Sequence, residues 1–242
     1  MKELILNGCS ELGLDISQKT ADALIKYYKI LIERNKSVNL TRITDPDEVV
    51  TKHFLDSLTT CLTGCVGKNV IDVGTGAGFP GLVLKCATPS IRLTLLDSLN
   101  KRISFLQDAA EEMGIRDGIE FMHSRAEDAG LDKNHREKYD TAVSRAVANM
   151  RTLSEWCLPL VRTGGYFLAL KGPLAEEELT DALPAIEVLG GEVEGIFTAK
   201  IPYTDLQHKI IIVKKVRHTP TQFPRKGKKA TEIPVEKVYK KK

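Results

Sequence analysis

Three glycines after a short apolar stretch form the clearest signal for chemistry in this sequence. Residues 70–73 (Val-Ile-Asp-Val) are mostly β-branched and predict a short buried strand. Gly74, Gly76 and Gly78 follow where the chain must turn into a helix. Glycines permit positive φ and let backbone N–H groups approach a ligand at the positive end of that helix. The stretch therefore predicts a binding loop for a nucleotide-like ligand.

A carboxylate follows these glycines at a spacing typical of nucleotide-binding folds. The strand predicted over residues 91–97 ends at Asp97, about 20 residues beyond the glycines, where a carboxylate can accept hydrogen bonds from ribose hydroxyls. The same side chain could instead be the N-cap of the helix that begins near Leu99. Both roles stay open at the level of sequence.

The details of the loop favour a compact adenosyl ligand over a dinucleotide. Gly76, Gly78 and Gly81 formally match the dinucleotide fingerprint, but Phe79 crowds the place of a pyrophosphate. A nicotinamide-dependent dehydrogenase would also need a substrate domain of about 100 further residues. S-adenosylmethionine has no pyrophosphate, and it needs a carboxylate for its ribose and backbone donors for its methionine end. We therefore expect S-adenosylmethionine as the cofactor.

Composition and cysteine usage are those of an ordinary globular protein. The chain has 242 residues, of which 42% are apolar and 28% charged. It shows neither an apolar run of about 20 residues nor a secretory pattern, so we expect a cytoplasmic protein without a membrane partner. Five cysteines occur without a Cys-x-x-Cys pair, which predicts neither a disulfide framework nor a metal site.

Positive charge is concentrated at the C-terminal end. Residues 209–242 contain 12 lysines and arginines and two glutamates, and carry +10, whereas residues 1–208 carry −7. Such a segment attracts phosphate backbones through counterion release. It could equally be a solvated, partly disordered tail. The two interpretations overlap, because basic tails often become ordered on RNA.

The remaining elements must position the glycine loop and Asp97. Two amphipathic helices come first, one capped by Ser17 and one running from Asp45 to about Leu62. Strands and helices then alternate, which predicts a Rossmann-like α/β fold with a seven-stranded, mostly parallel sheet whose last two strands can form a hairpin. This arrangement is typical of class I S-adenosylmethionine-dependent methyltransferases. We expect an N-terminal helical extension over residues 1–66, a methyltransferase domain over 67–217 and a basic tail over 218–242.

The loop after the fourth predicted strand, residues 143–147 (Val-Ser-Arg-Ala-Val), restricts the chemistry. It lacks the Asn- or Asp-Pro-Pro-aromatic run of enzymes that methylate exocyclic amines and the nucleophilic cysteine used on cytosine C5. An acceptor with an in-plane lone pair, such as guanine N7, needs no deprotonation, so that positioning and electrostatics supply the catalysis. The loop is compatible with that acceptor. Spacing alone assigns no chemistry to His53, Asp56 and Ser57 on the second helix.

Ordered motifs along nearly the whole chain resemble the small-subunit ribosomal RNA methyltransferase G family, also called glucose-inhibited division protein B. The motifs are Val70–Pro80, residues 95–102 with Phe105-Leu106, Arg125-Ala126-Glu127, Ser144-Arg145-Ala146-Val147, Leu168–Gly172, Phe223–Lys226, Asn39-Leu40-Thr41 and His53–Leu58. The resemblance implies a bacterial enzyme that moves a methyl group from S-adenosylmethionine to N7 of one guanine in the decoding region of 16S ribosomal RNA. We also expect a monomer. The transfer would be direct, without a covalent intermediate.

The resemblance also implies roles for single residues. The family's cofactor contacts fall on Gly74, Phe79, Ala126, Glu127 and Arg145, and the glycine pattern with its spacing adds Gly76, Gly78 and Asp97. Arg145 could hold the methionine carboxylate or an RNA phosphate, or form a surface ion pair. With Lys171 it is our candidate for electrostatic catalysis, and the expected RNA contacts are Lys101, Arg102, Arg125, Arg225 and Lys226. Residues 206–209 (Leu-Gln-His-Lys) depart from an Arg-containing stretch in related chains.

Three other functions remain compatible with the residues. A small-molecule methyltransferase would make the basic tail incidental, and a non-enzymatic RNA-binding protein could retain the adenosyl pocket without catalysis. A nicotinamide-linked oxidoreductase satisfies the glycine pattern formally. Transfer assays with RNA and with metabolites separate the first two from an RNA methyltransferase, and a nicotinamide titration tests the third.

The charge distribution generates the first testable prediction. Truncation after about Lys215 removes most of the basic residues of the C-terminal segment. We expect weaker RNA binding and a flatter dependence of affinity on salt, because fewer counterions are released. Filter binding of the truncated and full-length chains across a salt series measures both, and an unchanged affinity would contradict the prediction.

Overall fold

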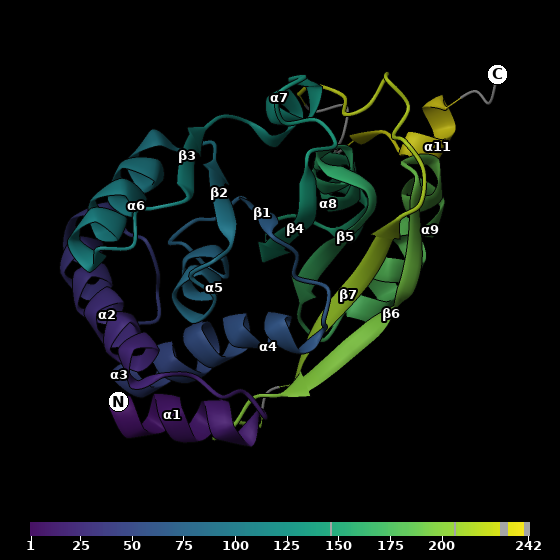
Figure 1. The fold of residues 1–242 in the computed structure, drawn as a ribbon. Helices are drawn as coiled ribbons and strands as arrows, with labels where there is room; N and C mark the ends of the chain where they lie inside the picture. Colours follow the sequence, from purple (N-terminus) through teal and green to yellow (C-terminus); the bar gives the residue numbers. More distant parts are fainter. Residues whose placement is uncertain (146, 206, 228–231, 240–242) are drawn as a thin grey trace.

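A single seven-stranded sheet forms the centre of the molecule. The computed structural model describes residues 1–145, 147–205, 207–227 and 232–239 (Figure 1). The strands are β1 (Asn69–Val73), β2 (Arg92–Asp97), β3 (Ile119–His123), β4 (Tyr139–Arg145), β5 (Val161–Lys171), β6 (Gly191–Lys200) and β7 (Gln207–Lys215). Their order is β3-β2-β1-β4-β5-β7-β6, and only β7 runs antiparallel to its neighbours. The predicted mostly parallel sheet with a terminal hairpin is confirmed.

Helices cover both faces of this sheet (Figure 1). They are α1 (Lys2–Glu11), α2 (Gln18–Val38), α3 (Pro46–Val49), the π-helix η1 (Val50–Leu55), α4 (Asp56–Leu62), α5 (Gly81–Ala87), α6 (Asn100–Met113), α7 (Ala126–Leu131), α8 (Met150–Cys157), the 3₁₀-helix η2 (Leu158–Leu160), α9 (Ala175–Val188) and α11 (Val235–Val238). Side chains alternate across each strand, so that Val70 belongs to an apolar cluster with side chains of α2, α5 and α6, whereas Ile71 belongs to one with side chains of α8 and α9. The sheet therefore has an apolar cluster on each face.

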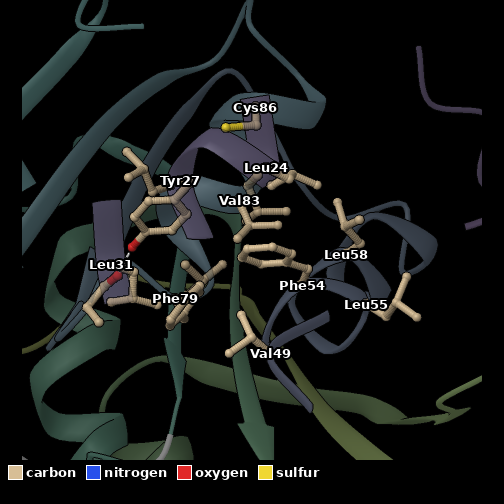
Figure 2. Close-up of a cluster of buried hydrophobic side chains, with 14 of the residues drawn as sticks. Leu24, Tyr27, Leu31, Val49, Phe54, Leu55, Leu58, Phe79, Val83 and Cys86 are labelled. Atoms are coloured by element: carbon tan, nitrogen blue, oxygen red, sulfur yellow. Dashed lines mark hydrogen bonds between the residues drawn. The ribbon is translucent and has the colours of Figure 1, made fainter. Parts of the chain in front are cut away.

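The N-terminal helices pack directly against the helix that follows the glycine loop. Figure 2 shows side chains of α2, of the segment from α3 to α4 and of α5 in one buried cluster. The ring of Tyr27 lies 6.2 Å from that of Phe54 and 5.6 Å from that of Phe79. The expected extension over residues 1–66 thus shares its hydrophobic core with the first half of the sheet. Its separation as a domain of its own stays a proposal.

Two features of this N-terminal region differ from the prediction of two helices. The helix capped by Ser17 is confirmed, since the Ser17 side chain accepts a hydrogen bond from the Thr20 amide at 3.1 Å. The second helix does end at Leu62, but it contains the π-helical segment η1. A further helix, α1, precedes both; it has no side-chain cap, and a Cβ at Gly8 would lie 2.5 Å from the Leu55 side chain. The helix α1 is therefore stabilised by its packing against the rest of the protein, and its sequence carries no capping signal that would predict it.

The chain beyond β7 folds back onto the sheet. Arg136 donates hydrogen bonds to the carbonyl oxygens of Thr219 and Phe223, both at 2.7 Å, and the Phe223 side chain is completely buried. The interpretation of residues 218–242 as a disordered tail does not describe this part. A truncation after Lys215 would remove a core aromatic residue together with the charges, so substitutions of exposed lysines and arginines test RNA binding more cleanly.

Within the described ranges, no helix has both the length and the apolarity that crossing a bilayer requires.

Candidate functional site

The carboxyl ends of β1, β2 and β4 border a cleft of about 410 Å³. Its walls come from the glycine loop, from the turns after β2 and β4, and from the N-terminal segment. The lining residues are Leu40, Thr41, His53, Gly74, Thr75, Gly76, Ala77, Phe79, Asp97, Ser98, Arg102, Arg145 and Val147. Hollows of similar size lie between α2 and α6 and at the amino ends of β2 and β3. The glycine loop reaches neither of them, and ligands of parallel α/β sheets bind at carboxyl ends.

A buried carboxylate holds the glycine loop in place. Asp72 Oδ2 accepts hydrogen bonds from the Thr75 hydroxyl and from the Gly81 amide, each at 2.8 Å. Burial raises the pKa of Asp72 to about 6, and these two bonds oppose part of that rise. The amides of Gly74 and Thr75 donate to the Leu96 carbonyl at 2.8 and 3.0 Å. The loop is therefore attached both to its own strand and to β2.

The three loop glycines have different tasks, although all have positive φ, at 71°, 59° and 85°. A Cβ at Gly76 would have no neighbour nearer than 3.9 Å, so this residue faces open space. A Cβ at Gly74 would meet the Val147 side chain at 2.6 Å. At Gly78 it would meet Leu106 and the Tyr27 hydroxyl, both at 2.8 Å. Gly78 therefore serves close packing and does not line the cleft, and its contact with the cofactor stays a prediction.

Asp97 lies at the cleft with its carboxylate almost fully buried. It accepts hydrogen bonds from the amides of Gly76 and Leu99, both at 2.9 Å, and from Arg102 at 3.2 Å. The helix α6 begins at Asn100 with Leu99 as its N-cap, so Asp97 does not fill the N-cap position. A carboxylate offers about four acceptor positions. One remains for a ribose hydroxyl even while the three donors are bound.

Arg145 is paired inside the protein. Its Nη1 lies 2.9 Å from Oδ2 of Asp56, a completely buried carboxylate, and its Nη2 lies 3.2 Å from His53 Nδ1. The guanidinium also lies over the Phe79 ring, 5.0 Å from its centroid. A surface ion pair is thus the wrong description of this arginine. Its charge is balanced by a buried partner, and the side chain still lines the cleft.

His53 completes this cluster as a neutral ring. It stacks on Phe79 with 4.5 Å between the centroids. Burial, together with the charge of Arg145, lowers the pKa of His53 to about 4. Sequence spacing assigned no chemistry to His53 and Asp56, because their partner Arg145 lies about 90 residues away in the chain and no local pattern signals such a pairing. The fold alone brings the three residues together.

Other predicted site residues lie beside the cleft. Lys171 donates to Glu178 and to the Ala148 carbonyl, both at 2.6 Å, and it does not line the cleft. This compensated, buried amine no longer supports an electrostatic role in catalysis. Ala126 and Glu127 begin α7, directly after the turn whose Ser124 amide bonds to the Asp97 carbonyl. They are neighbours of the cleft and not part of its lining.

The expected RNA contacts divide into free and paired side chains. The Arg225 guanidinium donates two hydrogen bonds to the buried carboxylate of Glu155, at 2.9 and 2.7 Å, so we withdraw it as an RNA contact. Lys226 pairs with Asp128 at 2.7 Å on the surface. Lys101 and Arg125 are exposed, and Arg102 is partly exposed. Ala146 and Leu206, which belong to sequence motifs noted above, lie outside the described residues.

No group of three or more metal-ligating side chains occurs among the residues with described positions.

Comparison with known proteins decides the family. The family model described as rRNA small subunit methyltransferase G matches residues 20–207. The chain belongs to this family. A ribosomal RNA small subunit methyltransferase G of Alkaliphilus oremlandii is 48% identical over 238 residues, covering 97% of this chain and 99% of the relative. That of Alkaliphilus metalliredigens is 46% identical over 237 residues, covering 97% and 98%. The chain is a small-subunit rRNA methyltransferase, and the predicted family is confirmed.

Solved structures agree with the fold of this methyltransferase. The S-adenosylmethionine-dependent O-methyltransferase of Thermotoga maritima aligns with a TM-score of 0.51 at 17% identity, covering 78% of this chain and 73% of that one. TrmN of Thermus thermophilus aligns with a TM-score of 0.51 at 17% identity, covering 69% and 53%. At such identities the likeness concerns the fold alone. It confirms the class I methyltransferase architecture.

The geometry of Asp97 generates a prediction for this methyltransferase. Asp97→Asn removes the charge that would accept the ribose hydroxyls, and hydrogen bonds to charged groups contribute about 1.5–3 kcal/mol. We expect affinity for S-adenosylmethionine, measured by calorimetry, to fall by at least about tenfold. Asp140→Asn is the matched control, because Asp140 also accepts two backbone amides and an arginine, but at the amino end of the sheet. Equal affinity losses in both variants would contradict the assignment.

Proposed function

We propose that the protein transfers the methyl group of S-adenosylmethionine to N7 of one guanine in 16S ribosomal RNA, by direct in-line attack and without a covalent intermediate. One observation carries this proposal: the cleft combines a rigid glycine loop and a ribose-compatible carboxylate, and none of its described lining residues has a side chain suited to activate the acceptor. We further propose that the enzyme acts as a monomer in the cytoplasm, where small ribosomal subunits are found.

The cleft residues fit the cofactor at both of its ends. Asp97 is placed to accept a hydrogen bond from a ribose hydroxyl, and Gly76 faces open space, so that its backbone can approach the cofactor closely. Arg145 and Phe79 form the wall beyond the glycine loop, where a cationic donor can bind the methionine carboxylate. When bound, the cofactor supplies an electrophilic sulfonium methyl group.

The polar side chains at the cleft support an acceptor that needs no deprotonation. His53 is the single imidazole in the described lining; its Nε2 lies 3.0 Å from the Thr41 hydroxyl and its Nδ1 3.0 Å from the Lys52 carbonyl. With a pKa of about 4 it is a weak base. The buried Ser144 hydroxyl donates to the Val73 carbonyl at 2.7 Å. Guanine N7 carries a free in-plane lone pair, so orientation and charge stabilisation are sufficient.

Exposed cations beside the cleft support RNA as the substrate. Lys101 directly precedes the cleft residue Arg102, and Arg125 follows the turn that bonds to Asp97. Arg42 lies next to Thr41 on the N-terminal wall. Within the described part of the chain, Lys101, Arg125 and Arg42 are not engaged in ion pairs. Such side chains contact phosphates without reading sequence.

Methyl transfer to ribosomal subunits tests the proposed function. Small subunits purified from a bacterium that lacks this gene, incubated with labelled S-adenosylmethionine and the protein, should acquire label at one guanine as 7-methylguanine. Naked 16S RNA in parallel shows whether assembly is needed, and Asp97→Asn gives the background of a variant with weakened cofactor binding. Label at another atom would contradict the N7 assignment, and no label at all would contradict the proposed reaction.

Substitution of the exposed cations tests the proposed RNA surface. The double variant Lys101→Ala/Arg125→Ala should bind small-subunit RNA more weakly, and the slope of log affinity against log salt should fall by about 1 to 2, because each phosphate contact releases about one counterion. Lys138→Ala is the control, since Lys138 is exposed at the hollow by the amino ends of the strands. An equal change in the control would show that only total charge matters.

A further inference from the structure

A carboxylate from the N-terminal segment is buried at the point where three elements meet. Asp56, the first residue of α4, is completely buried and lies against Arg145 at the end of β4. On its other side, Nδ1 of His208 near the start of β7 lies against Asp56 Oδ1. One side chain thus connects the N-terminal helices with two strands of the sheet.

The contact with Asp56 determines where the Arg145 guanidinium lies. Besides the 2.9 Å ion pair, its nitrogens contact only the Lys52 carbonyl and His53 Nδ1 within the described residues, both at 3.2 Å. Both of these are neutral groups, so Asp56 supplies the one charged partner among them. A buried ion pair that loses one partner leaves an uncompensated charge and is strongly destabilised. Arg145 would then leave its place over Phe79 and reorient toward solvent.

We propose that Asp56 is a positioning residue of the methyltransferase site, which acts by holding Arg145 over Phe79 at the cleft wall. The inference rests on the proposed function, in which Arg145 binds the methionine carboxylate. Balanced by Asp56, Arg145 is a directed hydrogen-bond donor and not a mobile cation that any phosphate could attract. On the opposite side Asp56 Oδ1 contacts His208, which forms an ion pair with it when the imidazole is protonated, so that β7 also borders this cluster.

The chain contains a matched pair that serves as a control. Glu155 is also completely buried and also pairs with an arginine, Arg225, but this pair fastens the C-terminal segment and does not line the cleft. Asp56→Asn and Glu155→Gln therefore each remove one completely buried negative charge that is paired with an arginine. Both substitutions can lower the fraction of folded protein. Only Asp56→Asn should also lower the affinity of the folded protein for S-adenosylmethionine.

The experiment measures affinity for S-adenosylmethionine by calorimetry, and kcat and KM for transfer to small subunits, well below the melting temperature of each variant. We expect Asp56→Asn to raise both Kd and KM for S-adenosylmethionine by about tenfold, and Glu155→Gln to change them by less than about twofold. The double variant Asp56→Asn/Arg145→Gln should bind no more weakly than Arg145→Gln alone, because residues that act as a unit are non-additive.

Three results would overturn the proposal: wild-type affinity in Asp56→Asn, equal losses in Asp56→Asn and Glu155→Gln, or losses that multiply in the double variant. If Asp56→Asn does not fold, His208→Gln loosens the same carboxylate from its other side and should raise Kd by about threefold; an unchanged Kd would again overturn it. Absence of methyl transfer by the wild-type protein would refute the proposed function instead, and the calorimetric comparison would still decide the role of Asp56.

Discussion

The shape of the glycine loop depends on a carboxylate that never reaches solvent. Asp72 lies in β1 beneath the loop and binds the Thr75 hydroxyl and the Gly81 amide, so it fixes the loop at its start and at the helix that follows. Burying a carboxylate is costly unless its oxygens are hydrogen-bonded. Here both donors bind Oδ2, which holds the loop in one conformation before any ligand binds, whereas Oδ1 has no hydrogen-bond partner among the described residues. The site is therefore largely preorganised.

Phe79 extends this constraint from the loop to the N-terminal helices. The ring packs against Tyr27 and Phe54 on one side, and His53 and Arg145 lie near it toward the cleft. The apolar core and the polar cluster share this ring, and the N-terminal segment adds Leu40, Thr41 and His53 to the wall of the site. A shift of these helices would move His53 and Asp56, and Arg145 with them. The position of Arg145 therefore depends on the packing of the N-terminal helices, although these segments lie far apart in the chain.

The sequence predicted those features of the fold that depend on residues close together in the chain. The strands, the glycine loop and the Ser17 cap all follow from residue types within a few positions. Asp97 was found through its spacing from the glycines. The pairs Asp56 with Arg145 and Arg225 with Glu155 join residues 89 and 70 positions apart. No local sequence pattern specifies which acidic side chain pairs with which basic one. The helices α7 and α1 were not predicted, because their stability comes from packing.

The net charge of the C-terminal segment can be counted from the sequence, but the partners of its charged side chains cannot. The basic C-terminal segment predicted a strong attraction to phosphate, yet several of its cations are already neutralised within the fold. Lys209 pairs with Glu176, Lys215 with Glu137 and Arg225 with Glu155. Burial and these partners remove such charges from the field that an RNA backbone experiences, because an ion pair has little net potential beyond a Debye length of about 10 Å. In the proposed function, the attraction comes from cations without such partners, and around the cleft the described ones are Lys101, Arg125 and Arg42. For the described residues of this segment, the total charge therefore overstates the charge that is left exposed to an RNA backbone.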